Sequence, residues 1–290
     1  MAEQNDIDEV TGVETTGHDW DGIKELNNPL PRWWLWTFYA TIVFSIGYTI
    51  AYPAWPGISG ATKGVLGWSS RGDVIADIAS VEASRAVLGD KVQSMDLADI
   101  QADPDLLQFA IAGGASAFKV NCSQCHGAGA GGGGGYPNLL DDDWIWGGEL
   151  EQIYLTLQHG IRYEPHEDTR LSDMPAFGAD DLLERSDIVD VAWYVRQLSG
   201  QDSDTEAALR GETVFADNCA ACHGDDGKGN RDLGAPDLSD AIWLYGGEQK
   251  EIVAQISKPQ QGVMPGWADR LSETTTKQLA IFVHSLGGGE

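Results

Sequence analysis

The pentapeptide Cys-x-x-Cys-His occurs twice in this chain, at residues 122–126 and 219–223, and the two copies use all four cysteines. Two thiols one helical turn apart can each bond a vinyl group of one porphyrin, and the adjoining imidazole then lies below the iron. The repeated motif therefore predicts two covalently bound haem c groups. The expected attachment and proximal residues are Cys122, Cys125 and His126 for the first haem, and Cys219, Cys222 and His223 for the second.

Zinc and disulfides are the alternatives for the same residues. Zinc clusters usually combine two Cys-x-x-Cys arms, without a histidine directly after each arm. A Cys-x-x-Cys disulfide closes too small a loop to add much stability, and it is more often redox-active than structural. Both alternatives fit the motif less well than haem does.

The sixth ligand of each iron decides between electron transfer and ligand chemistry. Met174 and Met264 both precede proline at matching places after the two motifs. Thioether ligation raises the reduction potential and closes the iron, whereas the alternative for a methionine is core packing. His159 and His166 compete as ligands in the first unit. The pattern leaves open whether each methionine binds the haem of its own unit or of the other, although proximity along the chain favours its own.

From Gly113 the chain repeats itself with an offset of about a hundred residues. Gly114 and Phe118 precede the first motif as Gly211 and Phe215 precede the second. Met-Pro segments and helical tails recur in the same order. We therefore expect two haem-binding units, 113–200 and 205–290, joined by a polar linker.

Each unit resembles a class I cytochrome c domain, with a first helix, the haem motif at its end, glycine-rich loops, a Met-Pro loop and a closing helix. The expected fold class is mainly α, with few or no strands. The resemblance implies that the carbonyls of Pro137 and Pro236 accept a hydrogen bond from the proximal imidazoles. Arg162 and Arg170, which precede Met174, are candidates to neutralise haem propionates, with surface ion pairing as the alternative.

An uncharged segment, residues 33–51, begins after a mostly acidic stretch and has aromatic residues at both ends. At about 1.5 Å per residue it spans roughly the hydrocarbon core of a membrane, and the aromatic ends are typical of interfacial belts. No small-residue cleavage site follows, so a retained anchor is favoured over a signal peptide. The expected organisation is a cytoplasmic tail (1–32), a transmembrane helix (33–52), a periplasmic linker with short helices (53–112) and the two haem units.

Acidic residues outnumber basic ones by 45 to 18, giving a net charge of −27. This balance argues against nucleic acid as a partner. It is equally consistent with steering a basic electron carrier and with a salt-adapted surface. Because bacterial c-type haems are attached outside the cytoplasm, we expect the haem units in the periplasm and the anchor in the inner membrane, crossing once.

The segment DWDGIKELNNPLPRWWLWTFYATIVFSIGYTIAYPAW, residues 19–55, resembles the start of the di-haem c subunit (subunit III) of cbb3-type cytochrome c oxidases. Two tandem haem units, with Arg162 and Met174-Pro-Ala-Phe-Gly178 in the first, continue the likeness to the C-terminus. The resemblance implies a subunit that accepts electrons from a donor cytochrome c. It would pass them through two haems to a mono-haem c subunit and on to the haem-copper catalytic subunit, which reduces oxygen and pumps protons.

The chain itself carries no visible oxygen site or proton path, so we expect an electron relay without catalytic residues inside an oxidoreductase complex. A membrane-anchored di-haem shuttle, or the cytochrome subunit of a periplasmic dehydrogenase, would share the haem units but not residues 19–55. A di-haem peroxidase would need one iron without a permanent methionine and a distal acid or base.

Overall fold

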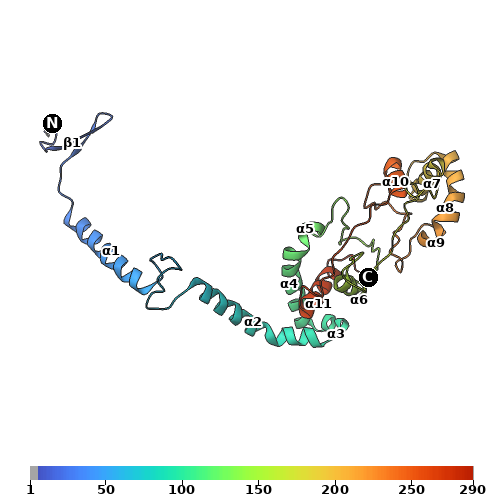
Figure 1. Ribbon diagram of the computed structural model, residues 1–290, viewed down its shortest axis with the longest axis horizontal. Helices are drawn as coiled ribbons and strands as arrows, with labels where there is room; N and C mark the ends of the chain where they lie inside the picture. The colour runs from blue at the N-terminus through green and yellow to red at the C-terminus, as the bar shows by residue number, and fades with distance from the viewer. Residues whose placement is uncertain (1–5, 290) are drawn as a thin grey trace. The chain divides into compact units, whose positions relative to one another are not determined.

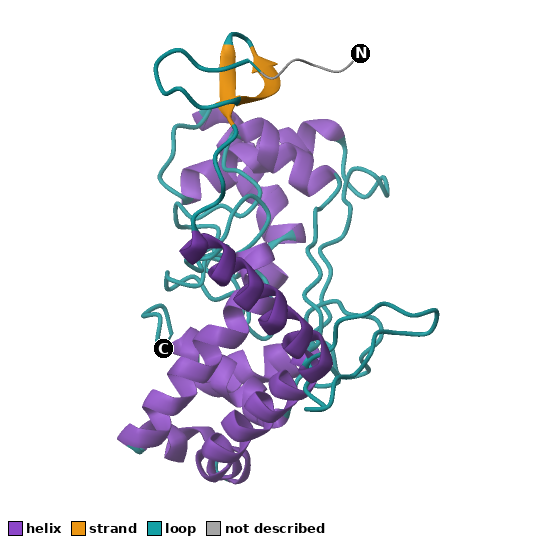
Figure 2. Cartoon of the chain, turned by 90° about the vertical axis from the view of Figure 1, so that its left-hand side faces the viewer, coloured by secondary structure: helices purple, strands orange, loops and turns teal. Residues whose placement is uncertain are grey.

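The computed structural model describes residues 6–289 of the chain. Helices dominate it, as expected, and the strands in this range form one small hairpin (Figures 1 and 2). Contacts divide the chain into two units, Met1–Ala83 and Ser84–Glu290. The elements are β1 (Thr15–Trp20), β2 (Ile23–Leu26), α1 (Arg32–Ala51), α2 (Ser70–Ser94), α3 (Leu97–Ala102), α4 (Pro104–Asn121), α5 (Ser123–His126), α6 (Leu150–His159), α7 (Arg185–Leu198), α8 (Thr205–Asn218), α9 (Ala220–His223), α10 (Gln249–Ser257) and α11 (Glu273–His284).

A two-stranded hairpin forms near the start of the chain, within the segment expected to be the cytoplasmic tail. β1 and β2 pair antiparallel, with Trp20 opposite Ile23. Asp21 and Gly22 form the turn with φ of 53° and 88°, and positive φ at both positions is what a two-residue type I′ turn requires. The Asp19 carboxylate accepts a hydrogen bond from the Gly22 amide at 2.6 Å. Local turn chemistry therefore orders this segment.

Helix α1 coincides with the uncharged segment. It is 20 residues long, is apolar along most of its length and buries none of its residues in the protein. At about 1.5 Å per residue its length is close to the roughly 30 Å of a bilayer core. Among the described residues, α1 is the one helix long and apolar enough to cross a membrane.

Helix α4 begins at the pair Asp103-Pro104. The Asp103 carboxylate accepts hydrogen bonds from the amides of Asp105 (3.0 Å) and Leu106 (3.2 Å), and Pro104 occupies the first turn. This cap satisfies two amides that have no partner inside the helix. Upstream, α2 spans 25 residues, where the pattern suggested short helices.

Helix pairing in the second unit does not follow the order of the repeats. α11 lies beside α4 and α6, whereas α7 lies beside α8 and α10 (Figure 1). α4 and α8 are the helices that lead into the two haem motifs. Each leading helix is therefore covered by the closing helix of the other repeat.

Two apolar cores result from this pairing. The first core draws its residues from two stretches of chain, 88–157 and 264–286. The second core draws its residues from one continuous stretch, 174–256. The stretch that forms the second core therefore lies, along the chain, between the two stretches that form the first core.

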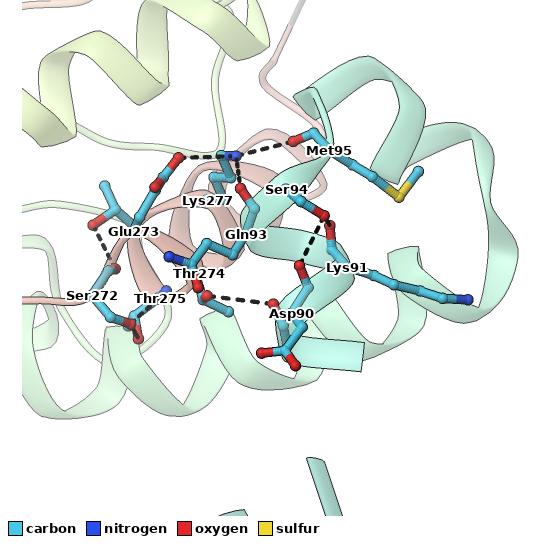
Figure 3. A network of polar contacts seen from close by, with 12 residues as sticks. Asp90, Lys91, Gln93, Ser94, Met95, Ser272, Glu273, Thr274, Thr275 and Lys277 are labelled. Carbon is cyan, nitrogen blue, oxygen red and sulfur yellow. Dashed lines mark hydrogen bonds and ion pairs between the residues drawn. The ribbon is translucent and has the colours of Figure 1, made fainter. Parts of the chain in front are cut away.

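A buried lysine fastens α11 to the end of α2 (Figure 3). The side chain of Lys277 is largely buried, and its Nζ donates to the carbonyl oxygens of Gln93 (2.7 Å) and Met95 (3.0 Å). Glu273, one turn earlier, lies 3.1 Å from the same Nζ. A cation at the last carbonyls of a helix satisfies orphan acceptors and matches the negative end of the helix dipole.

Candidate haem sites

The two Cys-x-x-Cys-His motifs form equivalent turns at the ends of α4 and α8. Cys122 and Cys219 continue the helices, with their amides bonded to the carbonyls of Phe118 (2.9 Å) and Phe215 (2.8 Å). Within each motif the first cysteine is the less exposed and the second is exposed. Burial raises the pKa of Cys122 and of Cys219 to about 11, so both are protonated at neutral pH.

The proximal histidines are held as the cytochrome c resemblance implies. His126 Nδ1 lies 3.2 Å from the Pro137 carbonyl oxygen, and His223 Nδ1 lies 3.1 Å from that of Pro236. Because a carbonyl only accepts, Nδ1 carries the proton and Nε2 keeps its lone pair. Burial lowers the pKa of both histidines, and the hydrogen bond to proline opposes this shift. Each imidazole is therefore oriented and kept neutral, as an iron ligand requires.

Met174 and Met264 both lie in apolar cores that contain a haem-motif cysteine. Met264 packs in the first core together with Phe118 and Cys122. Met174 packs in the second core together with Phe215 and Cys219. Met95, which lies between α2 and α3, also packs against the first core.

Two buried donors lack an acceptor in the described part of the protein, Arg170 Nε and Trp243 Nε1. The Arg170 guanidinium also lies over the Trp146 ring, 5.4 Å from its centroid, and Trp243 packs against the second core. Buried donors of this kind normally have partners, and a haem propionate is an acceptor of suitable charge. Sequence reasoning missed Trp243, although its repetition as Trp144 was the available signal.

The other candidate side chains have protein partners. Arg162 donates from Nε to the Gly262 carbonyl and from Nη1 to the Ser172 carbonyl, each at 2.9 Å. His159 Nδ1 and His166 Nε2 lie 3.4 Å apart, and Asp168 completes a small cluster with them. Across residues 6–289 this is the one group of three potential metal ligands of the His, Cys, Asp and Glu types. The cysteines of the two motifs do not assemble into one zinc-like cluster.

The donor set fits haem c at both motifs. Each has two thiols at a helix end, an oriented neutral imidazole, and a thioether in the adjoining core. The unpaired donors Arg170 Nε and Trp243 Nε1 would suit the two propionate-bearing edges.

Three family models match successive parts of the chain. The N-terminal domain of cytochrome oxidase-cbb3, FixP, matches residues 12–59. Cytochrome c matches residues 111–199. Cytochrome C oxidase, cbb3-type, subunit III, matches residues 206–283. The two haem-motif regions are therefore both of cytochrome c type, which confirms the expected fold class.

Full-length relatives agree. The chain is 55% identical over 284 residues to the cbb3-type cytochrome c oxidase subunit FixP of Rhizobium meliloti (strain 1021), covering 98% of each chain. It is 55% identical over 276 residues to the subunit CcoP of Cereibacter sphaeroides, covering 95% of each. It is 56% identical over 289 residues to the subunit FixPc of Rhizobium leguminosarum bv. viciae, covering 100% of each. Since these relatives match it over nearly their full length, the chain belongs to the FixP/CcoP family of cbb3-type cytochrome c oxidase subunits.

Proposed function

We propose that this chain binds two haem c groups and relays single electrons through them within a cbb3-type oxidase. The attachment residues are Cys122 and Cys125 for the first haem, and Cys219 and Cys222 for the second. The observation that carries the proposal is the repeated, matching geometry of two Cys-x-x-Cys-His motifs in a FixP/CcoP chain.

The residues around each motif support electron transfer. A bound haem c supplies reversible one-electron exchange at its iron. His126 and His223 would ligate through Nε2, each fixed by its proline carbonyl. Met174 and Met264 would close the sixth positions and raise the reduction potentials. The apolar cores around the two motifs would surround each haem with low-dielectric protein, which favours electron exchange with little reorganisation.

The partners follow from family membership and from charge. A donor cytochrome c would deliver electrons, and the mono-haem c subunit and the haem-copper catalytic subunit would receive them. The net charge of −27 supports a basic donor, because a negative surface steers a positive partner and loses that effect in salt. Helix α1 would cross the inner membrane once, with the N-terminus in the cytoplasm and the haem motifs in the periplasm.

The test is purification of the tagged full-length chain from mildly solubilised membranes. We expect two haem c per chain, co-purifying haem b and copper, and cyanide-sensitive oxygen uptake with reduced cytochrome c. Replacing both cysteines of one motif with alanine should reduce the count to one haem c. Two haems c without the other cofactors, under conditions that keep known complexes intact, would instead favour an anchored di-haem shuttle.

A further inference from the structure

We propose that the axial methionines are exchanged between the two repeats, so that Met264 pairs with His126 and Met174 with His223. This inference rests on the proposed His–Met ligation and specifies which methionine serves which haem. Linear order along the chain suggests the opposite pairing, Met174 with His126 and Met264 with His223. Helix packing, the loops that carry the methionines and the composition of the two cores all favour the exchange.

Each leading helix meets its closing helix at a glycine, where the two backbones are too close for a side chain to fit between them. A Cβ on Gly114 of α4 would lie 2.2 Å from the Gln278 carbonyl oxygen of α11. A Cβ on Gly211 of α8 would lie 2.2 Å from the Asp190 carbonyl oxygen of α7. In both repeats the glycine of the leading helix therefore receives the closing helix of the other repeat.

Aromatic and charged contacts repeat this pairing. The Phe118 ring of α4 lies 5.5 Å from the Phe282 ring of α11. The Phe215 ring of α8 lies 5.2 Å from the Tyr194 ring of α7. Arg210 of α8 also forms a bidentate pair with Asp190 of α7, with N–O distances of 2.6 and 2.7 Å. The closing helix is thus fixed on its partner along its length.

Backbone hydrogen bonds hold the Met264 loop against the first repeat. The amide of Met264 donates to the Ile161 carbonyl at 3.0 Å, and the Ile161 amide donates to the Met264 carbonyl at 2.9 Å. The Trp267 amide donates to the Leu157 carbonyl at 2.8 Å. Leu157 belongs to the first core, which also contains Cys122. Met264 is therefore held against the core that contains Cys122 of the first haem motif.

The Met174 loop is held against the second repeat in the same way. The amides of Gly178 and Ala179 donate to the Ser257 carbonyl at 3.2 and 2.9 Å. Phe177, three residues after Met174, is buried in the second core with Ile252 and Ile256 of α10. That core also contains Cys219. Met174 is therefore held against the core that contains Cys219 of the second haem motif.

Arg162 lies where the chain passes between the two cores. Its guanidinium donates to the Ser172 carbonyl, just before the chain enters the second core, and to the Gly262 carbonyl, just before the chain returns to the first core. Its own backbone has φ of 50°, a conformation uncommon for a residue with a side chain. The second core is then formed by one continuous stretch of chain, inserted between the two stretches that form the first core.

The test uses full-length chains that keep one haem. Replacing Cys219 and Cys222 with alanine leaves only the first haem, and the thioether-to-iron charge-transfer absorption of its oxidised form is then recorded. Under the proposal, Met264→Leu removes this absorption and Met174→Leu keeps it. The mirror experiment, with Cys122 and Cys125 replaced, must give the mirror result. Loss of the first-haem absorption in Met174→Leu with retention in Met264→Leu would overturn the exchange while leaving His–Met ligation intact.

A second pair of variants guards against misfolding. Met264→His in the first-haem protein should give the low-spin electron paramagnetic resonance signature of bis-imidazole ligation and a lower reduction potential. Met174→His in the same protein should leave the His–Met signature unchanged. If the absorption persists in both leucine variants and neither histidine variant alters the signature, the thioether comes from neither Met174 nor Met264, and the proposed ligand set fails together with the exchange.

Discussion

Replacing Lys277 with methionine should destabilise the attachment of α11 to α2. Methionine keeps most of the side-chain volume and removes the ammonium that binds the carbonyls of Gln93 and Met95 (Figure 3). Two hydrogen bonds from a charged donor contribute about 1.5–3 kcal/mol each. Relief of the cost of burying the ammonium offsets part of this loss. We expect a net destabilisation of about 2–3 kcal/mol.

Amide hydrogen exchange in the holoprotein measures the loss of stability at α11 itself. Since about 1.4 kcal/mol is a factor of ten in an equilibrium constant, amides of α11 should exchange roughly 30- to 150-fold faster through local opening. Lys250→Met, at an exposed lysine of α10, is the matched control and should change exchange by less than about threefold. Equal protection of α11 in the two variants would refute a net stabilising role for Lys277.

Three further outcomes follow from the packing and the charges. Gly211→Ala forces α8 away from the Asp190 carbonyl and should lower the free energy of unfolding in urea by about 1–3 kcal/mol. Gly89→Ala is the control, because its Cβ would lie in open space, and it should leave the free energy of unfolding unchanged or raise it by up to about 1 kcal/mol. Equal shifts would contradict the close approach. Burial, reinforced by the charge of Asp240, raises the pKa of Asp143 to about 6. The folded state then binds this proton more tightly than the unfolded chain, so the free energy of unfolding falls as the pH rises from 3.8 to about 6, by about 1 kcal/mol after solvent screening is allowed for. Asp143→Asn should flatten that part of the pH profile, and an unchanged profile would show that other groups cause it. Oxygen uptake with a basic cytochrome c should fall as added salt shortens the Debye length from about 30 Å to about 8 Å, while a salt-independent rate would favour a generally salt-adapted surface.

Local signals in the sequence predicted the elements that local chemistry determines. Asp103 and Pro104 are a readable signal for the start of α4, because an N-cap and a first-turn proline act within a few residues. The Asp21-Gly22 hairpin was missed, although that dipeptide is a strong turn signal. Asp73 is not the cap of α2, because the helix begins at Ser70. The Ser69 hydroxyl accepts a hydrogen bond from the Gly72 amide at 3.0 Å instead.

The pairing of the closing helices could not be read from the repeat. α7 and α11 occupy equivalent positions in two similar units, so their apolar faces suit either leading helix. One signal was available, since the short connection at residues 199–204 favours neighbouring antiparallel helices at α7 and α8. For α11, the decisive contacts involve Gly114 and Phe282, which are far apart in sequence. Such contacts depend on tertiary packing rather than on local pattern.

The nested arrangement of the two cores also sets the order in which they can be completed during synthesis. Chains emerge from the N-terminus onward. The second core needs nothing beyond residue 256. The first core must wait for residues 264–286, the last helical stretch to be made. The haem motif that leaves the ribosome first is therefore the last to receive its covering helix, and until then its apolar surface remains open to maturation factors or to misassembly.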